Sequence, residues 1–386
     1  MFVVLLGSCV QKNPDDFIAS ARAYQAQGDI RAAVIQVRNA VQQRPEDGDL
    51  RLYLGHLLLE VRDPVAADRE LRKALRYGQS LEVVLPSLAR AMLERGAERA
   101  LIDEFGAQVL AVPAAEATFK SALGRAYLHV GRADDAAASF NAAASAQPGY
   151  LPARIGMARV LSIGAELGPA LQLAQRLAAE HPASGGVLLL LSDVLGRRGE
   201  RAASKVALEQ AVGVDANYLP AQYALLTMLI DDQQLDAAAS QLNKTRQHAG
   251  EDLRVPYFDG VIRLHKGDLV GAREASRFVL SRAPEHVPTL VLTGALELKA
   301  EQPAAAETAL RKAISLDAQH VAARGLLVRT LLAASRPIEA LDALQPLLAA
   351  ASGKDPSVAA LAGETYMANG RLAEAAYYYA AAAESK

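Results

Sequence analysis

The chain has 386 residues, of which 79 are alanine, 5% are aromatic and none is tryptophan. Its 41 Lys and Arg against 43 Asp and Glu give a formal net charge of -2, so no general attraction to nucleic acid or to an anionic membrane is expected. A chain rich in small helix formers and poor in β-branched runs is expected to be mostly helical. Cys9 is the only cysteine, which excludes an internal disulfide and a cysteine-based zinc site.

Residues 1–13 are predicted to form a truncated signal with a lipobox, followed by a tether. Leu6-Gly7-Ser8-Cys9 has the residue order at which bacterial lipoprotein precursors are cut and the cysteine is lipidated. The polar residues that follow suit a short tether. A full secretory signal has a basic start and an apolar stretch of about 7 to 15 residues, and neither precedes Cys9. Two interpretations stay open: the natural start lies upstream, or the N-terminus is frayed and the match is accidental.

A repeat of 34 residues continues from residue 14 to residue 386. With Pro14 as position 1, units begin at residues 14, 48, 82, 117, 151, 185, 219, 253, 287, 321 and 356. Position 20 is alanine in nine of the eleven units, and position 8 is small in nine. Position 24 is usually bulky and position 15 is often glycine. Proline recurs at position 32, including Pro113 in the third unit, where it is expected to end the second helix.

These positions predict a pair of helices in each unit. Small residues at positions 8 and 20 let two helices cross closely, and the bulky residue at position 24 fills the space beside the crossing. Glycine at position 15 ends the first helix in a left-handed conformation. The pattern is that of the tetratricopeptide repeat, a helix-turn-helix unit. The predicted fold is all-α: an α-solenoid of about eleven such units in a right-handed superhelix over residues 14–386.

The sequence carries no recognisable catalytic or metal-binding motif. The seven histidines fall so that no two share a helix at metal-ligand spacing. Neither a phosphate-binding loop nor a Gly-x-Ser-x-Gly motif occurs. We therefore predict a protein that is not an enzyme, with no catalytic residue, no metal and no cofactor, and expect its function to lie on its surface.

Position 9 of each first helix is expected to line the concave side of the superhelix, together with positions 2, 5 and 12. In the first five units this position is basic or can become so, and these residues form a predicted ligand-binding row: Arg22, His56, Arg90, Arg125 and Arg159. A guanidinium repeated once per unit could bind carboxylates or an anionic polymer. The alternative is that each arginine pairs with a neighbouring acid such as Glu60 or Glu94 and only keeps the surface soluble.

From the seventh unit onward the same wall becomes apolar. The predicted partner-binding row consists of Tyr223, Tyr257, Phe258, Val261, Leu264 and Val291. An apolar groove of this length suits an extended or helical segment of a protein partner. The alternative is that these side chains are buried inside a tightly wound superhelix.

Residues 9–105 resemble a narrower family. Residues 28–40, 52–55, 63–74 and 84–91 are similar to the N-terminal region of the tetratricopeptide lipoproteins of the bacterial PEP-CTERM/exosortase system. That resemblance implies a lipidated N-terminal cysteine, which Cys9 matches, and a scaffold role in the cell envelope beside exopolysaccharide assembly.

The resulting hypothesis is a scaffold on the periplasmic face of the envelope, anchored by lipid in the outer membrane, that assists exopolysaccharide export or the sorting of PEP-CTERM surface proteins. Its partners would be proteins, with the membrane reached only through the lipid and with no nucleic acid bound. Two alternatives stay open. One is a periplasmic guide that binds anionic polysaccharide, and the other is a cytoplasmic adaptor whose Cys9 is never processed.

Lipidation of Cys9 can be tested by feeding labelled palmitate to cells that make the protein from its natural start. We expect label on the wild-type protein and none on Cys9→Ala, which should also lose membrane association. An unlabelled protein whose membrane association is unaffected by Cys9→Ala would contradict the anchor.

Overall fold

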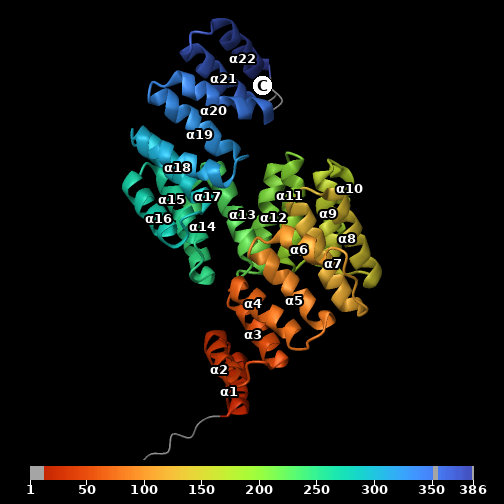
Figure 1. The fold of residues 1–386 in the computed structure, drawn as a ribbon. Coiled ribbons are helices and arrows are strands. Elements are labelled where there is room, and N and C mark those ends of the chain that lie inside the picture. Colours follow the sequence, from red (N-terminus) through yellow and green to blue (C-terminus); the bar gives the residue numbers. More distant parts are fainter. Residues whose placement is uncertain (1–12, 351–354, 385–386) are drawn as a thin grey trace, which may run out of the picture. The chain divides into compact units, whose positions relative to one another are not determined.

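The computed structural model describes residues 13–350 and 355–384, and these form 22 α-helices with no strand among them (Figure 1). In chain order the helices are α1 (Pro14–Ala26), α2 (Ile30–Gln43), α3 (Gly48–Glu60), α4 (Pro64–Arg76), α5 (Leu81–Glu94), α6 (Glu98–Phe105), α7 (Pro113–His129), α8 (Ala133–Ala146), α9 (Leu151–Ile163), α10 (Leu167–Glu180), α11 (Gly185–Arg197), α12 (Arg201–Val214), α13 (Leu219–Asp231), α14 (Leu235–Ala249), α15 (Arg254–Lys266), α16 (Leu269–Arg282), α17 (Val287–Lys299), α18 (Pro303–Leu316), α19 (Val321–Ala333), α20 (Pro337–Ala350), α21 (Pro356–Ala368) and α22 (Leu372–Glu384). The all-α prediction is confirmed.

The chain divides into two compact units, and the boundary falls between Ala207 and Leu208, within α12. In the first unit, α1 packs on α2, α3 on α4, and α7 on α8 as helix pairs. In the second unit, α13 to α22 form five further pairs. Within each unit, a pair also contacts the first helix of the next pair, as α4 contacts α5 and α18 contacts α19. Both units are therefore solenoids of stacked helix pairs, in which stability comes from neighbour contacts.

Several helix pairs are held together by a large side chain of the second helix that seats against a small residue of the first. Position 24 packs against position 8 in four pairs: Leu71 on Gly55, Phe140 on Gly124, Leu310 on Gly294, and Tyr379 on Gly363. A methyl group added at Gly124 would lie 2.8 Å from the Phe140 ring, which is fully buried. Burial of such a side chain contributes about 1.5–3 kcal/mol. The small and large residues of the repeat thus have the packing role that their spacing predicts.

The next pair completes this packing in two different ways. The Phe140 ring also contacts Gly156 of α9, so the ring is enclosed between two glycines. In α16 the corresponding residue is the small Ser276, and Leu292 of α17 instead comes within 3.0 Å of a methyl group placed on Gly260. The space beside the small residue is filled in both cases, either from its own pair or from the following one.

The turn inside every pair contains a left-handed residue at position 15. Six of these residues are the predicted glycines: Gly28, Gly96, Gly131, Gly199, Gly267 and Gly370. In the other five pairs a residue with a side chain adopts the same conformation, with φ between 56° and 63°: Arg62, Ala165, Gln233, Glu301 and Ser335. A left-handed conformation costs a residue with a Cβ roughly 1–2 kcal/mol. These five turns are therefore strained by the demands of the repeat.

A long polar side chain at position 4 connects the first helix to the loop before it. The side chain of Arg51 donates to the carbonyl of Pro45, and that of Arg324 donates to the carbonyl of Ala318, each six residues earlier. Gln222 makes the same kind of bond. These bonds satisfy carbonyl groups that follow the end of a helix.

The third pair departs from the repeat. α6 is only eight residues long and ends at Phe105. The carboxylate of Glu82 accepts from the backbone N–H groups of Ala111 and Val112, which holds the irregular segment that follows. Pro113 is the first residue of α7. The expectation that Pro113 ends the preceding helix is therefore wrong, because its fixed φ and missing N–H suit a helix start equally well.

Replacing Ala165 by glycine should raise the free energy of unfolding by about 1 kcal/mol, because glycine adopts the left-handed conformation without a steric cost. Gly131→Ala should lower it by about the same amount. Chemical denaturation followed by circular dichroism measures both.

Ala138→Gly is the matched control, since Ala138 is exposed within α8 and glycine there should cost about 1 kcal/mol. If Ala165→Gly is as destabilising as Ala138→Gly, the turn at position 165 is not strained.

Candidate partner-binding pocket

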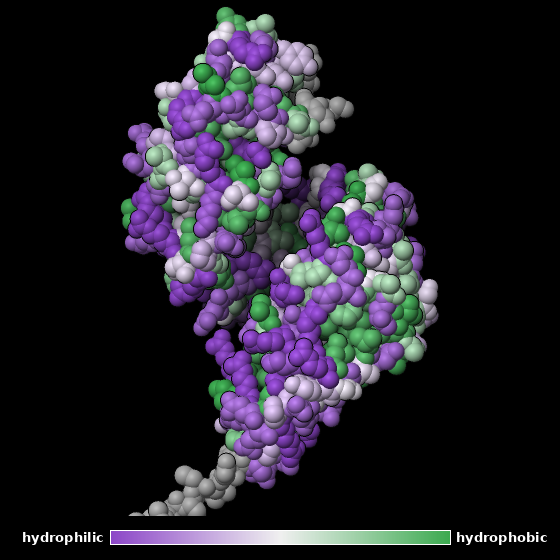
Figure 2. Space-filling view, viewed as in Figure 1, coloured by the Kyte–Doolittle hydropathy of each residue, from purple (hydrophilic) through white to green (hydrophobic). Residues whose placement is uncertain are grey.

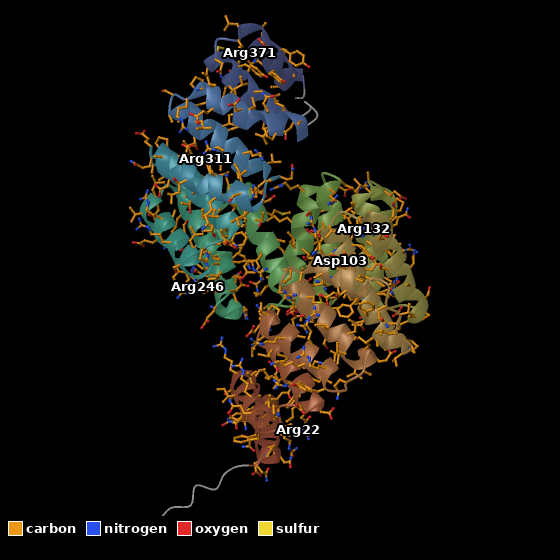
Figure 3. All side chains as sticks on the ribbon, in the orientation of Figure 1. Arg22, Asp103, Arg132, Arg246, Arg311 and Arg371 are labelled. Carbon is orange, nitrogen blue, oxygen red and sulfur yellow. The ribbon has the colours of Figure 1, made fainter. Side chains whose placement is uncertain are left out.

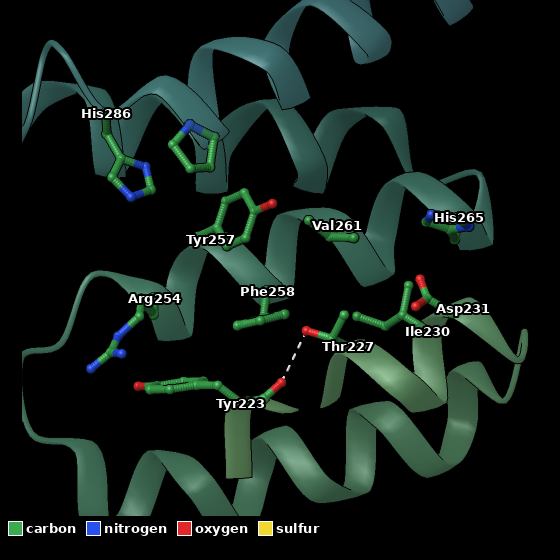
Figure 4. Close-up of a pocket in the computed structure, with 11 residues that line it drawn as sticks. Tyr223, Thr227, Ile230, Asp231, Arg254, Tyr257, Phe258, Val261, His265 and His286 are labelled. Atoms are coloured by element: carbon green, nitrogen blue, oxygen red, sulfur yellow. Dashed lines mark hydrogen bonds between the residues drawn. The ribbon is translucent and has the colours of Figure 1, made fainter. Parts of the chain in front are cut away.

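A cavity of about 460 Å³ lies in the second unit between α13, α15 and the start of α17 (Figure 4). It is lined by Tyr223, Thr227, Ile230, Asp231, Arg254, Tyr257, Phe258, Val261, His265, His286 and Pro288. Most of these residues occupy positions 2, 5, 9 and 12 of their units, the positions that the repeat predicts on one face of the first helices.

Three aromatic rings form the apolar part of this pocket. The rings of Tyr223 and Phe258 are stacked with centroids 5.5 Å apart, and the ring of Tyr257 meets Phe258 edge-on at 5.3 Å. The imidazole of His286 meets Tyr257 edge-on at 5.8 Å. Aromatic pairs in these geometries contribute about 0.5–1.5 kcal/mol beyond the area that they bury. The wall is consequently pre-arranged before any ligand binds.

Both ends of the pocket carry charged side chains. At one end the Arg254 guanidinium lies 4.2 Å from the centre of the Tyr223 ring. Asp252 accepts two bonds from Arg254 Nε at 3.0 and 3.1 Å. Burial opposes ionisation of Asp252, but the bonds from Arg254 hold the pKa of that carboxyl below its usual value. At the other end lie Asp231 and His265 (Figure 4).

The His286 side chain is half-buried at the Arg254 end. Its Nδ1 lies 2.7 Å from the Thr289 hydroxyl oxygen. Burial lowers the pKa of the His286 imidazole, so its neutral form is favoured. The neutral imidazole and the Tyr257 ring therefore extend the apolar wall up to the charged end.

Four residues of the predicted apolar row come together here, namely Tyr223, Tyr257, Phe258 and Val261. Tyr223 is buried, whereas the other three are half-buried with surface facing the cavity. Leu264 is half-buried outside the lining, and Val291 packs against the hydrophobic cluster around Leu290 and Leu327. The binding role of all six stays a prediction.

Sequence reasoning missed several lining residues. Arg254 and Pro288 stand at position 2, which the repeat had assigned to the same face, so a reading of that position along the chain would have found them. Asp231 and His265 stand at position 13, outside the assigned row. His286 precedes α17 as its N-cap residue, where helical periodicity gives no signal.

The predicted basic row lies on five successive first helices, one residue on each of α1, α3, α5, α7 and α9. Arg22 and Arg125 are exposed and Arg159 is half-buried; Figure 3 places Arg22 on α1. Arg90 Nε donates to Glu94 at 2.7 Å, as the alternative interpretation had it. His56 Nε2 lies 3.0 Å from the Ser87 hydroxyl oxygen, and burial lowers the pKa of this imidazole.

Three further findings bear on the sequence predictions. Cys9, the predicted lipidation site, lies outside the described residues. Within residues 13–350 and 355–384, no group of three or more His, Cys, Asp or Glu side chains gathers as a metal site would. None of the described helices has both the length and the hydrophobicity needed to cross a membrane.

Comparison with known proteins agrees with this architecture. Residues 297–364 match the sequence model of the tetratricopeptide repeat. The crystal structure of the APC/C hetero-tetramer Cut9-Hcn1 is similar with a TM-score of 0.51, at 11% identity, over 97% of this chain and 94% of that one. The chain has the fold of a tetratricopeptide-repeat solenoid. Yeast Tom70 is similar to this solenoid with a TM-score of 0.51, at 13% identity, over 98% of this chain and 86% of that one. No curated protein sequence matches the chain.

The pocket geometry predicts the titration of His286. In the wild-type solenoid its imidazole should titrate below the usual histidine pKa, and Tyr257→Ala should raise that pKa by admitting water to the ring. NMR spectra of the histidine ring protons across a pH series measure both values.

Phe278→Ala is the control, because Phe278 is an exposed aromatic residue of α16 that does not line the cavity. If Phe278→Ala shifts the titration of His286 as much as Tyr257→Ala does, Tyr257 is not what shields it.

Proposed function

We propose that this tetratricopeptide-repeat solenoid is a non-enzymatic scaffold that binds a segment of a protein partner in the pocket between α13, α15 and α17. The observation that carries the proposal is the combination of a pre-arranged aromatic wall with charged side chains at both ends, Arg254 at one and Asp231 at the other. Recognition of extended or helical segments commonly uses such a groove, with apolar anchors for affinity and polar contacts for specificity.

The chemistry of the pocket defines the segment it would take. A cavity of about 460 Å³ holds one large apolar side chain such as leucine or phenylalanine, whose burial contributes about 1.5–3 kcal/mol. An acidic residue on one side of that anchor would meet Arg254, whose side chain is 49% exposed although it is paired with Asp252. A basic residue on the other side would meet Asp231 (Figure 4). The charges orient the segment as well as attract it.

The similar solved structures are compatible with a partner-binding role. One of them is a hetero-tetramer in which Cut9 is assembled with Hcn1. This similarity of fold supports a solenoid that can bind another chain. Which partner it binds depends on the side chains of the pocket and not on the fold.

The finer proposal places the scaffold in the bacterial envelope, as a lipoprotein of the outer membrane that assists exopolysaccharide export or PEP-CTERM protein sorting. Its support is the Leu6-Gly7-Ser8-Cys9 tetrad and the resemblance of residues 9–105. If Cys9 is not processed, the same scaffold would act in the cytoplasm.

Direct binding of anionic polysaccharide by the basic row is the competing proposal. The exposed Arg22 and Arg125 support it, and the pairing of Arg90 with Glu94 weakens it, because a paired guanidinium has less charge to offer a polymer.

Selection of a random dodecapeptide library on the immobilised chain tests the peptide proposal. Enriched peptides should share one large apolar residue between an acidic and a basic residue. Arg254→Glu should remove the preference for the acidic flank, and Val261→Glu should weaken binding of enriched peptides by about tenfold or more, because it places a charge in the apolar wall.

Val270→Glu is the matched control, since Val270 is 66% exposed on α16 and does not line the cavity. The proposal fails if the enriched peptides carry no apolar residue, or if Val261→Glu and Val270→Glu bind them as the wild-type chain does.

A further inference from the structure

The repeat produces the same groove twice, once in each unit. In the first unit, α2 and α4 form its walls and α3 its floor, around a cavity of about 320 Å³. In the second unit, α18, α19 and α20 enclose a cavity of about 520 Å³. Both cavities are lined from repeat positions 4, 7, 19, 22, 23, 25, 28 and 29, and Leu58 at position 11 adds to the lining of the first. They are separate from the aromatic pocket, which no residue of either groove lines.

Two arginines hold matching places in the grooves. Position 25 is Arg38 in the first and Arg311 in the second. Position 4 is Arg51 in the first and Arg324 in the second, and each donates from Nε to a loop carbonyl, at 3.0 and 2.9 Å. The repeat therefore determines the shape of the groove. The residues at its other lining positions determine its charge.

In the first groove those positions leave an excess of positive charge. Arg51 is only 9% exposed and donates to Glu70 at 2.5 Å, so this pair is neutral and buried at the floor. Arg69 stands at position 22 with its side chain 66% exposed, and its Nε lies 3.6 Å from Glu70. Arg38 is exposed on α2, and no acceptor or ion-pair partner of its guanidinium is found among the described residues. The lining has a net formal charge of +2.

In the second groove, the positive charges of the arginines are balanced by carboxylates of the same lining. Position 22 is Asp342 instead of arginine, and position 19 is Glu339 instead of alanine. Arg311 Nε donates to Glu307 at 2.7 Å, and a Glu339 oxygen lies 3.8 Å from Arg311 and 2.5 Å from Arg336. The lining has no net formal charge, because Asp342 stands where the first groove has Arg69 and Glu339 adds a second carboxylate where it has Ala66.

We propose that the groove between α2 and α4 binds acidic side chains of a partner polypeptide. Two arginines on facing helices, Arg38 and Arg69, offer planar forks that match carboxylates, above a floor whose own charges are already paired. The small cavity accommodates one or two carboxylates. A long polyanion would need a wider basic surface than this groove in a chain of net charge -2. Figure 2 shows mainly hydrophilic side chains over the visible face of α1 to α4, as an exposed polar site requires.

Fluorescence anisotropy with a labelled (Glu-Ser-Gly)4 peptide tests this assignment on the full chain. The wild-type chain should bind this peptide and not (Gln-Ser-Gly)4, with affinity that falls as salt is added. The double variant Arg38→Ala, Arg69→Asp should bind the acidic peptide with an affinity at least about tenfold lower than that of the wild type, because it removes both charged donors. Arg31→Ala, an exposed arginine of the same helix outside the lining, should bind as the wild type does.

The second groove supplies a gain-of-function test. Glu307→Gln, Glu339→Ala, Asp342→Arg and Ala343→Glu together remove both carboxylates near Arg311 and give the lining the net formal charge of +2 that the first groove has. This variant should bind a second equivalent of the acidic peptide. All substituted residues lie at the surface or groove rim, and circular dichroism checks that each variant remains folded.

Three results would overturn the assignment: equal binding by the Arg38/Arg69 variant, no second equivalent in the four-residue variant of the second groove, or binding lost instead through joint substitution of Arg90, Arg125 and Arg159 by alanine. The last result would place acidic binding on the predicted basic row. None of these outcomes depends on the aromatic pocket, so the two binding sites are tested independently.

Discussion

The structure depends on one kind of contact: a large side chain of a second helix seated against a small residue of the first. Phe140 shows it most fully, because its ring is buried between Gly124 and Gly156. The absence of a Cβ lets the helices approach, and the ring then fills the space that would otherwise be a cavity. Because this contact uses positions 8 and 24 in the pairs that form it, many other positions of the repeat are free to vary without loss of the fold.

The binding surfaces are formed by these variable positions. The aromatic pocket uses positions 2, 5, 9 and 12 of the first helices, and the basic groove uses positions 22 and 25 of the second helices. Neither set includes positions 8, 20 and 24, at which the helices interlock. A tetratricopeptide-repeat solenoid can therefore carry chemically different sites on different faces, and a change at one site leaves the packing and the other site in place.

The fold could be predicted from sequence because packing repeats. Eleven helix pairs with small residues at fixed spacing leave little choice of architecture, and the turn glycines followed from the same count. Pro113 was misjudged because a proline suits either end of a helix, and only Phe105 at the end of a short α6 decides the matter. His286 was missed because it precedes α17 as its N-cap residue, where the helical period gives no signal, whereas Arg254 stands at position 2 and the period alone could have found it.

The seating of Phe140 has a consequence for how such a chain can be rearranged. Its ring requires glycine at position 6 of the following unit, and Gly156 is the one residue without a side chain at that position in the eleven units. Conversely, the small Ser276 requires a neighbour such as Leu292 to reach across to Gly260. The side-chain volumes of neighbouring units are thus complementary where the units touch. This complementarity determines which unit can follow which along the chain. Shuffling or deleting single repeats would separate those matched pairs even though every repeat keeps its own helices.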